Sequence, residues 1–500
     1  MSGAAAASKR PMAGLLGIFI AAMMAGMNNR VGALALADLR GAGGFGFDDA
    51  SWLATVYNAG ELIAMPFAAW FAITLSVRRF ELWMLGACAM LAAVLPFVHD
   101  LGLLLVLRFA QGVACGTMIP LLMMAALKFL PPPVRLYGLA LYAMTATFAP
   151  NLSIWLAGYW PDGLVDWRWI YWQSVPLAML AGLLVGWGLP REAVQRERFR
   201  QANWTGMACG VPGLGLLAVV LDQGGRLDWF HSPLVNTAAL AACALLAVYL
   251  LSEWHHPAPF IKLQILGRRN LALGFTAFLL LLVVLMSAAL LPSTHLARLH
   301  DYRPWQLAPI GLAVALPQLV LGPMVALLLY RRWADARIVF AAGLGLTALA
   351  CFAGAGLTAD WNREQFVLAQ ALQACGQPMA VVSMLFLITS VVQPPEGPYV
   401  SGAVNTLRAV GSLVGAAVVG QLVTVRGRFH ADMLVAHAAL TDDAGAPGPS
   451  ELAAIVGQQA LVLSVADAYR VLGALALLLV PLVLRLTHVP APTLSSSHHG

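Results

Sequence analysis

Long apolar runs recur along the whole chain, and they constrain its fold more than any single motif. A helix needs about 20 predominantly apolar residues to cross a bilayer. Hydrophobic residues make up 60% of the sequence and charged residues only 10%, whereas soluble domains carry about 25% charged residues. The sequence therefore predicts an all-α polytopic membrane protein. Its fourteen predicted spans are 12–36, 51–73, 81–99, 102–127, 135–160, 168–189, 204–221, 233–252, 271–294, 305–330, 337–357, 365–391, 401–425 and 462–486.

Basic residues in the short loops indicate how the chain is oriented. An even number of spans places both termini on one side, and cytoplasmic loops carry an excess of Lys and Arg. The side that holds the N-terminus receives about twice as many basic residues as the other, so both termini are predicted to be cytoplasmic. The formal charge of +6 is distributed over these loops and does not indicate nucleic-acid binding. The phosphate-binding sequence GxxxxGK[ST] is absent, which argues against transport driven by ATP.

Arg108 places a permanent positive charge inside an apolar helix. A guanidinium stays protonated under cellular conditions, and placing one near the bilayer centre costs roughly 3 kcal/mol. Gln111, Gly112 and Gly116 follow on the same helical face, and the two glycines predict a close helix contact of the small-xxx-small type. A charge this costly is expected to face a partner or a watery cavity. The helix thus favours a membrane protein that moves a solute.

Five strings along the chain carry a more specific signal. LRFAQGVACG (107–116) fits the pattern R-x-x-Q-G-x-x-x-G in full. The others are WRWIYWQSVP (167–176), LDQGGRLDWF (221–230), LGRRN (266–270) and SGAVNTLRAVGSLVG (401–415). In order and spacing they resemble the major facilitator superfamily, and in particular its fourteen-helix drug/proton antiporter branch of the EmrB and QacA type. The resemblance covers almost the whole chain.

The resemblance implies the major facilitator fold, with two six-helix bundles and two helices inserted between them. Its application to this chain predicts seven regions. These are a cytoplasmic N-terminus 1–11, an N-terminal bundle 12–189, a cytoplasmic linker 190–203, inserted helices 204–252, a second cytoplasmic linker 253–270, a C-terminal bundle 271–488 and a cytoplasmic tail 489–500.

The resemblance also implies an activity and its setting. Members of this branch export lipophilic or amphiphilic compounds from the bacterial inner membrane against an inward flow of protons, by alternating access around a central cavity. In bacteria with two membranes, such exporters work with a periplasmic adaptor protein and an outer-membrane channel. A long outer loop predicted at 426–461 is compatible with a docking surface for such a partner or with a flexible connector.

The chain departs from the branch at three places. The Asp usual in the first helix is replaced by Asn28, with Arg30 two residues on. The Gly-Pro of the fifth-helix antiporter motif becomes Ser153-Ile154, and the loop after the second helix keeps only its final pair of arginines. These departures are consistent with drift in a working transporter, or with altered proton coupling or substrate charge.

Glu61, in the second predicted span, is the acidic residue that could replace the missing Asp. A low-dielectric surrounding favours the neutral form of a carboxyl group, which lets such a group exchange protons near neutral pH. Tyr57 and Asn58 share its helical face. We therefore predict that Glu61 and Arg108 take part in proton coupling. The alternative is a static pair of Glu61 with Arg30 or Arg108 that only orients helices.

The other polar residues within spans divide into cavity and structural candidates. Arg30 either reaches the membrane surface from its helix end or attracts anionic substrates in the cavity. The further cavity candidates are Asn28, Asn58, Gln111, Trp155, Gln373, Asn405 and Arg408. Structural roles are predicted for Gly112, Gly116, Asp222, Asp228, Asp467 and Arg470. The last two are expected to form an ion pair within one helical turn.

Two kinds of substrate remain open at this point. The first is a lipophilic or amphiphilic toxic compound exported by proton antiport, and the second is an organic anion, such as an aromatic or fatty acid, exported with altered coupling. A non-transporting sensor on the same fold is disfavoured, because the glycines of helices four and thirteen are retained. No paired carboxylates, nucleophile or metal-ligand cluster supports an enzyme, and no cofactor or metal is expected.

Overall fold

The computed structural model describes residues 11–130, 134–438 and 448–491, and these residues form helices and connecting turns without a strand. Among them, 14 helices are long and apolar enough to cross a membrane, which confirms the predicted all-α polytopic fold. The long helices are α1 Pro11–Leu34, α3 Phe47–Leu75, α4 Val77–Val94, α5 Leu101–Phe129, α6 Arg135–Gly158, α8 Ser174–Gly188, α10 Trp204–Gln223, α11 Pro233–His255, α12 Arg269–Leu299, α13 Pro304–Leu329, α14 Ala336–Gly354, α15 Val367–Thr389, α16 Gly397–Ala438 and α17 Pro449–Leu484. Short helical segments lie between them: α2 Leu36–Gly43, η1 Leu95–Phe97, η3 Tyr159–Gly163, α7 Trp169–Trp172, α9 Glu197–Gln201, η4 Trp229–His231, η5 Leu263–Gly267 and η6 Pro394–Glu396.

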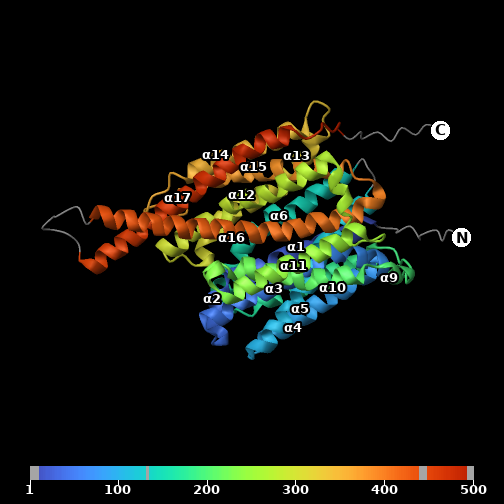
Figure 1. Ribbon diagram of the computed structural model, residues 1–500, viewed down its shortest axis with the longest axis horizontal. Helices are drawn as coiled ribbons and strands as arrows, with labels where there is room; N and C mark the ends of the chain where they lie inside the picture. Colours follow the sequence, from blue (N-terminus) through green and yellow to red (C-terminus); the bar gives the residue numbers. More distant parts are fainter. Residues whose placement is uncertain (1–10, 131–133, 439–447, 492–500) are drawn as a thin grey trace.

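The helices form two six-helix halves and an inserted pair (Figure 1). The N-terminal half runs from α1 to α8 and the C-terminal half from α12 to α17. The halves meet where α6 packs against α13 and where α3 and α5 pack against α16. Helices α10 and α11 pair with each other, and α10 also packs on α3 and α16, through an apolar cluster that includes Ile63, Leu214 and Leu413. The inserted pair therefore covers the seam between the halves on one side.

The two predicted linkers meet on the N-terminal half. Their aromatic side chains gather around Trp70 of α3. Its ring centroid lies 5.6 Å from that of Phe199 in the first linker and 5.1 Å from that of Phe260 in the second. The predicted N-terminus 1–11 and tail 489–500 lie largely outside the described residues.

The C-terminal half ends in two helices that are much longer than a membrane span. α16 has 42 residues and α17 has 36, so α16 is about 63 Å long, twice the roughly 30 Å of a bilayer core. Together they project beyond the other helices as a hairpin, at the left of Figure 1. The predicted outer loop 426–461 is therefore wrong for most of its length. Residues 426–438 continue α16 and residues 449–461 begin α17.

The hairpin is held together by an ionic cluster where the two helices leave the bundle. Asp467 of α17 accepts hydrogen bonds from Arg426 Nε at 2.7 Å and from Arg470 Nη1 at 2.8 Å, and its Oδ2 lies 2.8 Å from His430 Nε2. The structure thus contains the predicted Asp467–Arg470 pair, but Asp467 also binds two residues of α16. The cross-helix bonds explain why this polar stretch is helical and not a loop.

Glycines let α3 and α5 approach each other closely, as predicted for Gly112 and Gly116. A Cβ atom at Gly112 would overlap the backbone of Tyr57, and one at Gly116 would lie 2.8 Å from the Cα of Glu61. Gly60 of α3 faces α5 in the same way, because its Cβ would lie 2.9 Å from the Val113 amide nitrogen. The backbone around Glu61 is therefore fixed against the helix that carries Arg108.

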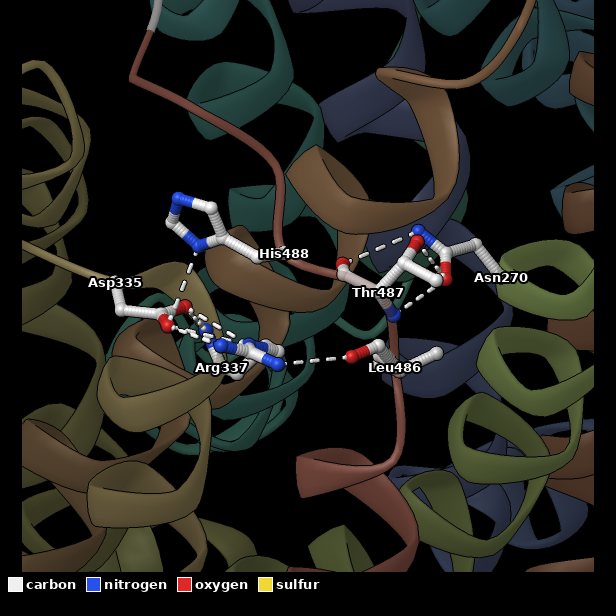
Figure 2. A network of polar contacts seen from close by, with 6 residues as sticks. All are labelled: Asn270, Asp335, Arg337, Leu486, Thr487 and His488. Atoms are coloured by element: carbon white, nitrogen blue, oxygen red, sulfur yellow. Dashed lines mark hydrogen bonds and ion pairs between the residues drawn. The ribbon is translucent and has the colours of Figure 1, made fainter.

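The end of α17 is fastened to α12 and α14 by a polar network opposite the hairpin (Figure 2). Asn270 Oδ1 accepts bonds from the backbone nitrogen of Thr487 at 2.8 Å and from its hydroxyl at 2.7 Å. Arg337 Nη2 donates to Asp335 Oδ2 at 2.7 Å, and its Nη1 donates to the Leu486 carbonyl at 3.1 Å. The hydrogen bonds from Arg337 hold the pKa of the Asp335 carboxyl below its usual range.

We expect Asp335→Asn to lower the stability of the protein in detergent at neutral pH by about 1–2 kcal/mol, because it removes a charge-assisted pair. A carboxyl with a lowered folded-state pKa contributes stability above its unfolded pKa, and that contribution is lost as the pH falls through the folded value. The difference between wild type and variant should therefore begin to shrink near pH 4 and continue to fall as the pH is lowered further. Thermal unfolding over a pH series measures it. The exposed Asp360→Asn is the control, and equal neutral-pH stability of wild type and Asp335→Asn would contradict the prediction.

Candidate functional site

A central cavity of about 240 Å³ lies between the two halves. Helices α1 and α6 form its wall on the N-terminal side, and α12, α15 and α16 form the opposite wall. Most of the lining is apolar. Its polar and charged lining residues are Arg30, Asn151, Ser293, Gln377, Arg408 and Ser412. The cavity can therefore receive a molecule that is mainly apolar and carries a polar or charged group.

Two arginines enter this cavity from opposite halves. Arg30 comes from α1 and Arg408 from α16, and no acidic residue lines the cavity with them. Arg408 donates from Nη2 to the Thr145 carbonyl at 2.5 Å and from Nη1 to the Thr145 hydroxyl, which ties α16 to α6. Arg30 has no such anchor among the described residues. Of the two predicted positions for Arg30, the structure thus has the one in the cavity.

Glu61 lies beside these arginines without binding either of them directly. It is partly buried on α3, and its charge interacts with those of Arg30 and Arg408. In the described part of the chain, no cation comes within the 4.0 Å that would make an ion pair with Glu61. The static pairs Glu61–Arg30 and Glu61–Arg108 are therefore not formed. Glu61 is therefore a carboxyl group without an ion-pair partner in the described part of the chain, and it interacts electrostatically with two arginines.

Arg108 is enclosed by aromatic rings instead of an acid. Its side chain is 2% exposed, and its guanidinium carbon lies 4.6 Å from the ring centroid of Tyr57 and 5.4 Å from that of Tyr171. Its Nη1 donates to Gln111 Oε1 at 2.7 Å. Cation–π contacts stabilise a desolvated guanidinium. Arg108 therefore belongs to the packed interior of the N-terminal half, and its predicted direct contact with Glu61 is absent.

Six of the predicted cavity residues lie outside the lining of the central cavity. They are Asn28, Asn58, Gln111, Trp155, Gln373 and Asn405. Four of them are bound within the helix packing. Asn28 faces Tyr57 and Cys115 inside the N-terminal half, and Gln111 holds Arg108. Gln373 donates to Ser287 at 2.8 Å, and Asn405 accepts from the Tyr142 hydroxyl at 2.9 Å.

The other two have partners of a different kind. Trp155 stacks on Tyr159 with ring centroids 4.9 Å apart. Asn58 bonds to Asn29 and to Asp222 of the inserted pair. Asp228, in contrast, is exposed, and its nearest recorded partner is His231 at 3.5 Å. The predicted structural role of Asp222 thus corresponds to a contact between α10 and α3.

Sequence reasoning missed three features of the site. Gln377 and Asn151 line the cavity, and both stand out only as polar residues in apolar spans. Glu81 of α4 is fully buried, and neither carboxyl oxygen has a hydrogen-bond partner in the described residues. Glu81 could have been singled out from the sequence, because it is an acidic residue within an apolar run. An ionised carboxylate at this place would lack every compensating partner.

At the hairpin end, one arginine joins the two halves. Arg303, at the start of α13, places Nη2 2.6 Å from Asp38 Oδ1 and 2.9 Å from Asp162 Oδ1. Both carboxylates belong to the N-terminal half. These ion pairs connect the two halves at that end of the molecule.

Comparison with known proteins agrees with this architecture. Residues 18–416 match the family model described as Major Facilitator Superfamily. The chain is 23% identical over 443 residues to the multidrug export protein EmrB of Escherichia coli K12, covering 87% of this chain and 83% of that protein. It is 24% identical over 429 residues to the fatty acid resistance protein FarB of Neisseria gonorrhoeae, covering 84% and 82%. These relatives confirm the resemblance to the EmrB and QacA type.

Solved structures share the fold at low sequence identity. The proton:xylose symporter XylE superposes with a TM-score of 0.60 at 11% identity, covering 97% of this chain and 98% of that one. The human organic anion transporter MFSD10 has a TM-score of 0.56 at 13% identity, covering 93% and 99%. At these identities the likeness concerns the fold alone.

Proposed function

Because the chain belongs to the Major Facilitator Superfamily, we propose that it exports lipophilic or amphiphilic toxic compounds through a membrane in exchange for protons. The observation that carries this proposal is the central cavity between the two halves. It is mainly apolar, and Glu61, which forms no ion pair among the described residues, interacts electrostatically with the two arginines that line it. The multidrug export protein EmrB as a relative supports the same activity.

In the proposed cycle, Glu61 carries the proton and the two halves alternate access to the cavity. A group that exchanges protons with both sides must be free of permanent partners. Glu61 meets this condition, because the arginines act on it without forming an ion pair with it. While Glu61 is ionised, its charge offsets those of the two arginines and favours a neutral or cationic amphiphile in the cavity. Protonation of Glu61 removes this effect, so proton and substrate compete, as antiport requires. Substrate and proton binding are thereby linked electrostatically.

The test is transport in proteoliposomes with an imposed pH gradient. Purified protein is assayed with a panel of a neutral lipophile, a cationic dye and an aromatic carboxylate. We expect substrate movement that requires the gradient, reverses when the gradient is reversed, and stops when an ionophore dissipates it. Movement that ignores the gradient for every substrate would refute proton antiport. No movement of any of the three would refute the substrate class.

A second candidate function is the export of organic anions, and the charge of the cavity favours it specifically. Both charged residues of the lining are arginines. A guanidinium binds a carboxylate through two parallel hydrogen bonds, and Arg30 has its donors free of protein partners in the described residues. The relative FarB, a fatty acid resistance protein, supports this candidate.

We expect Arg30→Gln to weaken binding of an aromatic carboxylate about ten-fold or more, because it removes a desolvated charge-assisted contact. Binding of a cationic dye should be unchanged or stronger, since one repelling charge is gone. Scintillation-proximity or calorimetric binding in detergent measures both ligands. Arg40→Gln serves as the control, because Arg40 does not line the cavity. Equal losses for anion and cation in Arg30→Gln would contradict the organic-anion candidate.

The proposed setting is the inner membrane of a bacterium, with both termini in the cytoplasm and the hairpin outside. The excess of basic loop residues on the terminal side supports this orientation. We also propose that a periplasmic adaptor protein and an outer-membrane channel continue the route, with the projecting hairpin of α16 and α17 as the observation in favour. Co-purification of an adaptor with the full chain, and its loss when residues 430–460 are shortened, would test the partnership.

A further inference from the structure

The inserted helix pair is joined to the N-terminal half by polar contacts as well as by apolar packing. Asp222, at the end of α10, accepts a hydrogen bond from the Thr55 hydroxyl and another from Asn58 Nδ2 at 3.3 Å. Both partners are on α3. Asp222 is nevertheless an exposed residue, so its carboxyl group is bound to the protein and still reachable from solution.

These contacts continue from Asp222 toward the central cavity. Asn58 Oδ1 accepts a hydrogen bond from Asn29 Nδ2 at 2.5 Å, and Asn29 directly precedes the cavity residue Arg30. Glu61 follows Asn58 by one helical turn, about 4.5 Å along α3. Asn58 is therefore bound to Asp222 on one side, and its spacing of three residues places it on the same face of α3 as Glu61.

In the other direction, the contacts reach the surface at the hairpin end. Gln223 donates to Thr55 at 2.6 Å and accepts from Arg226 Nε at 2.6 Å. Arg226 Nη1 lies 2.6 Å from Asp48, whose side chain is 79% exposed. The charged groups near Asp222 are thus Arg226 with Asp48, and Asp228 with His231. Each of these has a partner of opposite charge or a histidine, whereas Asp222 has only neutral partners.

From this chain of contacts we infer that Asp222 is the proton-collecting residue of the transporter, which receives protons from the outer solution and passes them to Glu61. The inference rests on the proposed proton antiport and assigns a task to the inserted helices within it. A hydronium ion protonates the Asp222 carboxylate. Asp222 then returns to the carboxylate as its proton moves, along the polar path beside Asn58, to the Glu61 carboxylate. No other bond forms or breaks.

The decisive variant is Asp222→Asn, because an amide oxygen can still accept the bonds from Thr55 and Asn58 but cannot carry a proton. The cationic dye or the aromatic carboxylate of the panel above, whichever the wild type transports, is added to purified protein in detergent, and the proton exchanged on binding is followed with a pH indicator in stopped flow. We expect the amount of exchanged proton to stay as in wild type and its rate to fall about ten-fold or more. The loss of rate should shrink as the solution is made more acidic.

Asp228→Asn is the matched control, because Asp228 is exposed and lies in the segment that connects α10 to α11. This variant should keep the wild-type rate. Asn58→Ala breaks the path while leaving the Thr55–Asp222 bond, and is expected to slow exchange as well; it also serves if Asp222→Asn does not fold. Wild-type rates in Asp222→Asn and Asn58→Ala would overturn the inference. Asp222 would then only hold α10 against α3. Failure of the proposed function differs from this outcome, because no proton would then be exchanged on substrate binding even in wild type.

Discussion

The Glu61→Gln variant is expected to fold and to bind substrate, but to lose transport driven by a proton gradient by a factor of about 100 or more. Glutamine has nearly the same volume as glutamate, so the packing of α3 against α5 should survive. It cannot take up a proton, and it leaves the charges of Arg30 and Arg408 without an opposing carboxylate. Binding of an aromatic carboxylate should therefore lose its dependence on pH and become stronger above neutral pH.

Glu81→Gln is the matched control for this experiment. Glu81 is a glutamate of the N-terminal half that is fully buried, and, unlike Glu61, it does not interact electrostatically with the arginines of the cavity. We expect this variant to retain gradient-driven transport in the same proteoliposomes. Unchanged gradient-driven transport by Glu61→Gln would mean that another group carries the proton, whereas equal losses in both variants would indicate a general effect of neutralising buried acids.

Gly116→Val is expected to prevent correct packing of the N-terminal half. The Cβ alone would lie 2.8 Å from the Glu61 Cα, and backbone atoms cannot move aside as the end of a flexible side chain can. Overpacking of this kind costs about 1–3 kcal/mol or more, and here it would separate two helices whose contact depends on small residues. We expect little monodisperse protein in detergent and a lowered Tm for what remains.

Size-exclusion chromatography of fluorescently tagged protein measures this effect directly. Gly86→Val is the control, because no atom lies within 4 Å of the position that its Cβ would take. It carries the same change of helix propensity without the steric conflict. A Gly116→Val protein as abundant and stable as Gly86→Val would show that α3 and α5 tolerate a wider separation.

The membrane spans could be predicted from the sequence because each requires a long apolar run. Such runs are present even where the chain differs from the family motifs. The hairpin could not be predicted, since the segment around Arg426 and Asp432 is too polar for a span and resembles a loop by composition. Its helices are stabilised by contacts between segments about 40 residues apart, such as Arg426 with Asp467. Sequence periodicity within either segment does not reveal that pairing.

The candidate site divides in the same way. The two arginines that line the cavity, Arg30 and Arg408, could be identified as candidates, because a charge in an apolar span is energetically costly and is therefore expected to have a function. The assignment of Asn28 and Gln111 to the cavity failed, since the rotation of each helix about its axis is set by packing and not by its own sequence. An acidic partner was expected for Arg108, but its guanidinium lies over the rings of Tyr57 and Tyr171. These tyrosines belong to other helices, and the sequence does not show that folding brings them to Arg108.

The long hairpin of α16 and α17 has a mechanical consequence. Both helices belong to the C-terminal half, and Arg408, in the wall of the cavity, lies on α16 itself. In the proposed alternating access, in which one half rocks against the other, α16 would move as a single rod with the C-terminal half. A small angular change at the cavity then becomes a wide sweep at the far tip. The hairpin is in this sense a lever arm, which transmits a conformational change at the buried cavity to the projecting ends of α16 and α17.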